Sequence, residues 1–168
     1  ARTWGAPGTV ARTLRIRGEV LGADGLDDVA EAAALAESST LRMEAARCLA
    51  AYGAALRRHR RPAEAREPLR RALELAERCG SPQRAALARM SLALALAELG
   101  KTRAALAAAD AAAPALPGHA GAQLAVQRSL IEERLGRFDA ALAGYDRALP
   151  VLQAAGDKLW EARLRCNR

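Results

Sequence analysis

Few residues in this chain could perform chemistry, and none stands at a spacing typical of a catalytic or metal site. His59 and His119 are its two histidines, and Cys48, Cys79 and Cys166 its three cysteines. A zinc site needs closely spaced Cys or His ligands, and a cysteine nucleophile needs a partnering histidine. The wide separation of these residues predicts no metal, no cofactor and no catalytic residue. Cys48 lies on an apolar helical stripe, so we interpret it as a small core residue.

Gly100-Lys101-Thr102 resembles the end of a phosphate-binding loop. Such a loop needs a glycine five residues before its last glycine, where this chain has Ala95, and it follows a strand. We therefore interpret this segment as a turn between two helices. The sequence also contains no Gly-x-Ser-x-Gly elbow and no Ser-His-Asp arrangement, so we expect a protein that is not an enzyme.

The positive charge of the chain comes mainly from arginine, and the net charge is +7. Four arginines cluster in Arg57-Arg58-His59-Arg60-Arg61, a group that could hold phosphates. No aromatic residue interleaves with them and no recognition helix surrounds them. We interpret the cluster as a solvated helix end, where positive charge is favourable, and predict no direct nucleic-acid contact by this segment.

The location of the protein is predicted from what the chain lacks. It has no run of about 18 apolar residues, so we expect no membrane span. An odd number of distant cysteines is typical of a reducing compartment, and we predict a cytoplasmic protein. The sequence starts at Ala1 without a methionine and stops within a helical pattern at Arg168, so we expect a fragment of a larger multidomain protein.

Hydrophobic periodicity predicts nine helices and no strands. The expected ranges are 7–21, 26–37, 41–58, 62–78, 82–99, 102–113, 120–135, 138–155 and a ninth from 157 onward. Ser38-Ser39-Thr40 is expected to cap the third helix, with Thr40 and Glu44 in a capping arrangement. Pro68 and Pro150 fall inside helices, and we expect each to kink its helix or to start a new turn there.

Small residues recur at about 36 to 40 residues, which is typical of stacked helical repeats. The series is Gly53, Ala65 and Ala72, then Ala93, Ala105 and Ala112, then Ser129, Ala141 and Ala148. The fold class is therefore predicted as all-α, a right-handed superhelix of about four antiparallel helix pairs. We expect one domain over 1–168, with repeats at about 7–39, 40–80, 81–117 and 118–156, and a partial repeat at 157–168.

These positions resemble the tetratricopeptide repeat, a unit with two small residues followed by an alanine at this spacing. Pro117 matches the proline that ends that unit, and Tyr145 stands at its aromatic position. The resemblance implies that the first helix of each pair lines a concave groove. The groove residues it implies are Arg47, Ala54, Arg57, Arg58, Leu87, Met90, Leu94, Glu98, Gln123, Val126, Leu130, Glu133 and Arg134.

An apolar strip flanked by charge suits an amphipathic helix or an extended peptide. We therefore predict a non-enzymatic interaction scaffold with a protein or peptide partner, and we expect Leu94→Asp to abolish binding. The carboxylate clamp with which some members of this family bind chaperone tails is not matched, because Ala50 and Ala54 replace its polar residues. We predict no chaperone-tail binding.

Two narrower resemblances suggest different parent proteins. The stretch from Trp4 to Ala76 is similar to the helical-repeat region of LuxR-type ATPase regulators, which would make the chain an effector-sensing segment. The stretch from Leu135 to Arg163 is similar to repeats that precede CHAT-type protease domains. Apolar end surfaces at Trp4 and Trp160 also predict end-to-end self-association.

Overall fold

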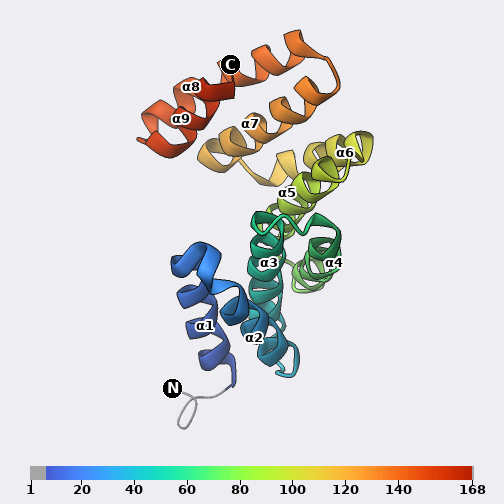
Figure 1. The fold of residues 1–168 in the computed structure, drawn as a ribbon, viewed down its shortest axis with the longest axis vertical. Coiled ribbons are helices and arrows are strands. Elements are labelled where there is room, and N and C mark those ends of the chain that lie inside the picture. Colours follow the sequence, from blue (N-terminus) through green and yellow to red (C-terminus); the bar gives the residue numbers. More distant parts are fainter. Residues whose placement is uncertain (1–6, 168) are drawn as a thin grey trace.

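The computed structural model describes residues 7–167, and this part of the chain is helical throughout (Figure 1). Short turns join most of the helices, and 3-10 segments at Gly22–Gly25 and Ala113–Ala115 join the rest. The helices are α1 (Pro7–Leu21), α2 (Leu26–Glu37), α3 (Arg42–Arg58), α4 (Pro62–Arg78), α5 (Pro82–Glu98), α6 (Thr102–Ala112), α7 (Gly118–Arg134), α8 (Phe138–Ala154) and α9 (Lys158–Asn167). Their bounds agree with the predicted ranges to within two residues.

The helices pack as consecutive antiparallel pairs, α1 with α2, α3 with α4, α5 with α6 and α7 with α8. The first helix of each pair also contacts the first helix of the next pair. Figure 1 shows these pairs following one another along the long axis of the molecule, from α1 and α2 to α7, α8 and α9. The predicted superhelix of antiparallel helix pairs is confirmed.

Five of the turns end a helix in the same way, with one residue in the left-handed backbone region. In each turn the N–H after that residue bonds to a carbonyl five positions earlier, as between Lys101 and Leu96 at 2.8 Å. This is the Schellman motif, and it favours glycine because a Cβ is strained there. Four turns supply Gly80, Gly100, Gly136 and Gly156, but the α3–α4 turn has Arg60 with φ of 61°.

The start of α3 differs from the prediction. Leu41 precedes the helix and no side chain caps it. Instead, the Ser39 hydroxyl accepts a hydrogen bond from the Leu41 backbone N–H at 3.2 Å. Glu44 does not complete a capping box with Thr40, because its carboxylate lies buried among arginines.

The two internal prolines do not interrupt their helices. Pro68 lies within α4 and Pro150 within α8, and both helices continue through them. A proline has no N–H for the carbonyl one turn earlier, which belongs to Glu64 in α4 and to Asp146 in α8, and both of these residues are exposed. Because water can reach this side of each helix, the lost backbone bond does not force a new turn there.

The small-residue ladder lies at the contacts within the helix pairs. All nine of its positions are buried, and the eight that carry a side chain are at most 2% exposed. Gly53 shows why size matters, since a Cβ there would lie 2.5 Å from Leu69 Cγ and 3.2 Å from the Ala65 carbonyl oxygen. Small residues therefore set the separation of α3 and α4.

The last helices share a core of their own, built around Tyr145, Leu152 and Leu164. Leu124 and Ile131 of α7 connect this part to the cores of α5 and α6. Trp160 is half-buried against the last core, with the Arg163 guanidinium 5.1 Å from its ring centre, whereas Trp4 lies outside the described residues.

We predict that Arg60→Gly stabilises the protein. A non-glycine residue in the left-handed region costs roughly 1–2 kcal/mol, part of which is offset by the greater freedom of glycine in the unfolded chain. The free energy of unfolding in urea should rise by about 0.5–1 kcal/mol. Gly100→Ala is the matched control and should lower it, because it introduces the same strain into an equivalent turn. A lower stability for Arg60→Gly would contradict this account.

Gly53→Ala should destabilise the protein although alanine is the better helix former. Overpacking against Leu69 and the Ala65 carbonyl costs about 1–3 kcal/mol, which exceeds the helix-propensity gain of about 1 kcal/mol. Urea unfolding measures the difference. The control is Gly144→Ala in a chain that carries Ser129→Ala. With the Ser129 hydroxyl gone, the nearest atom to the new Cβ is Cβ of residue 129 at 3.4 Å, so this change should be neutral or stabilising.

Candidate functional site

The first helices of the first three pairs enclose an open cavity of about 340 Å³. Its lining comes from α1, α3 and α5 and, through Ala72 and Ala76, from α4. The lining residues are Arg15, Glu19, Ala46, Arg47, Ala50, Ala51, Ala54, Ala72, Ala76, Arg84, Leu87, Ala88 and Ser91. We call this cavity the α1/α3/α5 groove.

Alanine forms the floor of the groove, supplying seven of its thirteen lining residues. Several of these alanines also lie where helices pack, including Ala72 and Ala76 of α4, each 1% exposed. Since a methyl group fills little space, the same residues that bring the backbones together leave a hollow above them. The hollow has the volume of a small ligand pocket, for which about 300–1,000 Å³ is typical.

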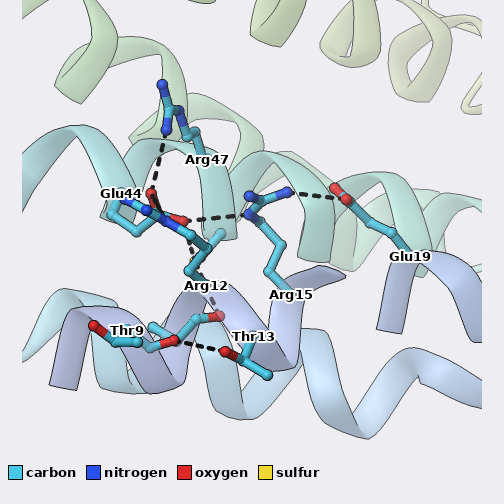
Figure 2. A network of polar contacts seen from close by, with 9 residues as sticks. Thr9, Arg12, Thr13, Arg15, Glu19, Glu44 and Arg47 are labelled. Atoms are coloured by element: carbon cyan, nitrogen blue, oxygen red, sulfur yellow. Dashed lines mark hydrogen bonds and ion pairs between the residues drawn. The ribbon is translucent and has the colours of Figure 1, made fainter. Parts of the chain in front are cut away.

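One edge of the groove is held by Glu44, a carboxylate that is only 4% exposed (Figure 2). Arg12 Nε lies 3.5 Å from its Oε2, Arg15 Nε 3.4 Å from its Oε1 and Arg47 Nη1 3.4 Å from its Oε2. Arg15 also pairs with Glu19 at 2.9 Å. Figure 2 shows that this network joins α1 to α3. Two of its arginines, Arg15 and Arg47, line the cavity.

Two groove arginines retain unused hydrogen-bond donors. The Nε atom of Arg47 is buried and has no hydrogen-bond partner. An unpaired buried donor of this kind costs about 1–3 kcal/mol. Within residues 7–167, no carboxylate pairs with Arg84, which is exposed in the first turn of α5. The groove therefore carries positive charge that the protein itself leaves unneutralised.

A second hollow of about 400 Å³ lies farther along the stack, between Arg60, Pro62, Glu98 and Arg134. Arg57 of α3 reaches across to α5 and pairs with Glu98 at 2.7 Å. This ion pair closes the space between the two helices. Glu98 is thereby engaged within the protein, at the edge of the second hollow.

The structure brings only some of the predicted groove residues together. Arg47, Ala54 and Leu87 line the α1/α3/α5 groove. Glu98 and Arg134 line the second hollow instead. Arg57 is engaged by Glu98, and Arg58 is exposed at the end of α3.

Other predicted groove residues lie in helix contacts rather than in the lining of either hollow. Val126 is 0% exposed in the core of α7 to α9, where no partner can reach it. Met90 packs beside the core of α5 and α6. Glu133 accepts a hydrogen bond from the Tyr145 hydroxyl at 3.1 Å, and burial together with this carboxylate raises the pKa of Tyr145.

The remaining predicted positions are Leu94, Leu130 and Gln123. Leu94 and Leu130 are half-buried and line neither of the two hollows. Gln123 donates to Asp157 at 3.0 Å. The groove that the structure supports is thus shorter than the predicted one and shifted toward the N-terminal pairs.

Of the polar lining residues, sequence reasoning missed Arg15, Glu19, Arg84 and Ser91. Arg84 lies one helical turn before Leu87, which was predicted, so extending the helical phase backward would have found it. Arg15 and Glu19 gave no such signal, because the repeat spacing is weak in α1. Only the packing of α1 on α3 places them at the groove.

Cys48 and the Gly100-Lys101-Thr102 segment have structural places in the fold. The Cys48 thiol is 0% exposed, and burial raises its pKa to about 11, so it stays protonated at neutral pH. Gly100-Lys101-Thr102 is the α5–α6 turn. Among residues 7–167, no three Asp, Glu, Cys or His residues gather as a metal site would require, and no helix is long and apolar enough to cross a bilayer.

His119 has a carboxylate partner, Asp157, which lies 2.6 Å away and links the start of α7 to the start of α9. Asp157 also accepts the Trp160 backbone N–H at 3.1 Å, which caps α9. This N–H and the His119 ring lower the pKa of Asp157. The pair therefore positions two helix ends, and it lies outside the lining of the α1/α3/α5 groove.

Several solved structures share this fold. A Rap protein complexed with competence and sporulation factor superposes with a TM-score of 0.84 at 18% identity, over 96% of this chain and 47% of that chain. The Rap conjugation gene regulator of the plasmid pLS20, in complex with the Phr* peptide, gives 0.82 at 19% identity over 96% and 47%. YrrB, a tetratricopeptide-repeat protein with an unusual peptide-binding site, gives 0.54 at 21% identity over 84% and 82%.

This chain spans about half the length of the Rap proteins that it matches. No family model matches the chain. No curated protein matches its sequence. At these identities the likeness concerns the fold, which is a helical-repeat solenoid of the tetratricopeptide type.

Proposed function

We propose that this chain is a non-enzymatic scaffold that binds a peptide, or an exposed segment of a partner protein, in the α1/α3/α5 groove. The observation that carries the proposal is a cavity of about 340 Å³ with an alanine floor, bordered by Arg47 and by Arg84, which has no acidic partner among residues 7–167. An apolar floor with a few polar groups around it is typical of a binding site, where the polar groups orient the ligand.

The matched structures support this proposal. One of them was solved with the Phr* peptide, one with competence and sporulation factor, and the third is described by its peptide-binding site. Stacked helix pairs suit such partners, because repeated first helices form a long surface that is rigid before binding. A preformed groove lets a short segment bind without ordering the scaffold.

Filling the groove should abolish binding. Ala50 lines the cavity from the middle of α3, and Ala50→Phe would place a ring in the space that a partner needs. The probe is a phage-displayed library of random peptides selected on the full chain. Selected peptides should bind Ala50→Phe at least about tenfold more weakly, a loss of about 1.4 kcal/mol, while circular dichroism stays unchanged.

Ala107→Phe is the matched control, because Ala107 is an exposed alanine on α6 and does not line the groove. It should bind the selected peptides as the unchanged chain does. Equal binding to Ala50→Phe and the unchanged chain would overturn the proposal, as would a selection that yields no binding peptide. We choose Ala50 rather than Leu94 for this test, because Leu94 does not line the α1/α3/α5 groove.

The regulator that the sequence resembles would use the same groove. As the alternative assignment, we propose that the chain is the effector-sensing segment of a LuxR-type ATP-dependent regulator. The complete reading frame tests this alternative. An upstream phosphate-binding loop with a downstream helix-turn-helix would support it, and a downstream CHAT-type protease domain would contradict it.

We also propose that the isolated chain associates end to end through its last helix. Leu159 of α9 is 61% exposed beside the half-buried Trp160, and an uncovered repeat end is prone to association. Light scattering should give a mass that rises with concentration, and Leu159→Lys should reduce that rise. A monomeric mass at every concentration would contradict the proposal.

A further inference from the structure

The charge around the α1/α3/α5 groove says more about its occupant. Arg15, Arg47 and Arg84 line it, and Glu19 is the single acidic residue of the lining. Glu19 is already engaged, since Arg15 Nη1 binds it at 2.9 Å. The groove therefore offers a net positive charge to whatever enters it.

Arg47 and Arg84 have the donors that this occupant would use. Glu44 engages only Nη1 of Arg47, at 3.4 Å, and the Arg47 side chain remains 35% exposed. No acidic side chain of residues 7–167 pairs with Arg84. A guanidinium binds a carboxylate through two parallel N–H bonds, and such charge-assisted bonds are stronger than neutral ones.

The position of Arg84 is unfavourable for the protein alone. Arg84 is the third residue of α5, and the first turn of that helix has no acidic residue. Cations are disfavoured at this end of a helix, because the N-terminus carries partial positive charge. Because Arg84 also lines the groove, an acidic occupant could supply the partner that this helix end lacks.

The apolar floor of the groove suits an apolar group of the occupant, next to the group that binds the arginines. Ala46, Ala50 and Ala54 form one row along α3, at intervals of one helical turn, and Leu87 lies across from it on α5. A large apolar side chain would cover these methyl groups and remove them from water. The lining contains no aromatic side chain on which a nucleic-acid base could stack.

We infer that the groove binds a peptide segment in which an acidic side chain, held by Arg84 and Arg47, stands next to a bulky apolar side chain that covers the alanine floor. This inference rests on the proposed function and specifies the chemistry of its partner. Aspartate or glutamate within the segment supplies the carboxylate. The bulky side chain supplies the apolar area.

The library selection on the full chain tests the inference first. Aspartate and glutamate should be enriched beside leucine or an aromatic residue in the selected peptides, relative to the starting library. An enriched peptide is then synthesised with an amidated C-terminus, alongside a version in which its acidic residue is replaced by the corresponding amide. Fluorescence anisotropy should show that the amide version binds at least about tenfold more weakly.

Arg84→Gln gives the matching change in the protein. This substitution should weaken binding of the acidic peptide by a similar factor but leave binding of the amide version unaffected. Added salt should weaken binding of the acidic peptide to the unchanged chain and should not weaken binding of the amide version. Arg103→Gln is the control, because Arg103 is exposed on α6, lies outside the groove and has no acidic partner among residues 7–167. Arg84→Gln should also raise the urea midpoint of unfolding, since it removes a cation from a helix N-terminus.

The possible outcomes separate the two proposals. The selected peptides could bind the unchanged chain and lose affinity for Ala50→Phe, yet show no acidic enrichment and no sensitivity to Arg84→Gln. That result would overturn this inference and leave the scaffold proposal intact. Peptides that bind equally to Ala50→Phe would overturn both. Sensitivity to Arg84→Gln that requires a free C-terminal carboxylate would overturn the side-chain assignment, as would preferential binding of a fluorescent single-stranded oligonucleotide over the acidic peptide.

Discussion

Close contact between paired helices is the constraint on which the rest of this structure depends. Gly53 approaches Leu69 so closely that even a methyl group would collide, and alanines fill the corresponding positions of the next pair. Each pair is thereby packed closely enough to stack on the next pair as one unit. With bulky residues at these crossings, the axes would separate and the pairs would stack differently.

The small volume of these side chains also creates the candidate binding groove. The core of this protein is built largely from alanine, so apolar burial comes from many small contacts. Where three first helices meet, their alanines cannot fill the space above them, and a hollow remains. Stability of the solenoid and the presence of a groove thus have one cause.

Electrostatics fixes the edge of that groove. Glu44 is buried, and removal of such a carboxylate from water is tolerated only because three guanidiniums surround it. The arrangement joins the first pair to the second and orders Arg15 and Arg47 at the same time (Figure 2). Arg84 has no such partner, and this asymmetry distinguishes the side of the groove formed by α5 from the side formed by α1 and α3.

The sequence by itself determined the helices, their turns and their pairing. Glycine at left-handed turns and small residues at a fixed period act locally or between neighbouring helices, so pattern alone reveals them. The sequence pattern could not show that Val126 is buried, that Arg57 pairs with Glu98, or that Arg15 and Arg47 line the same groove. Those facts depend on the angle at which one pair stacks on the next, and the repeat period does not encode that angle. Tertiary packing alone decided where the groove lies, because a hollow is the space that side chains from four separate helices fail to fill.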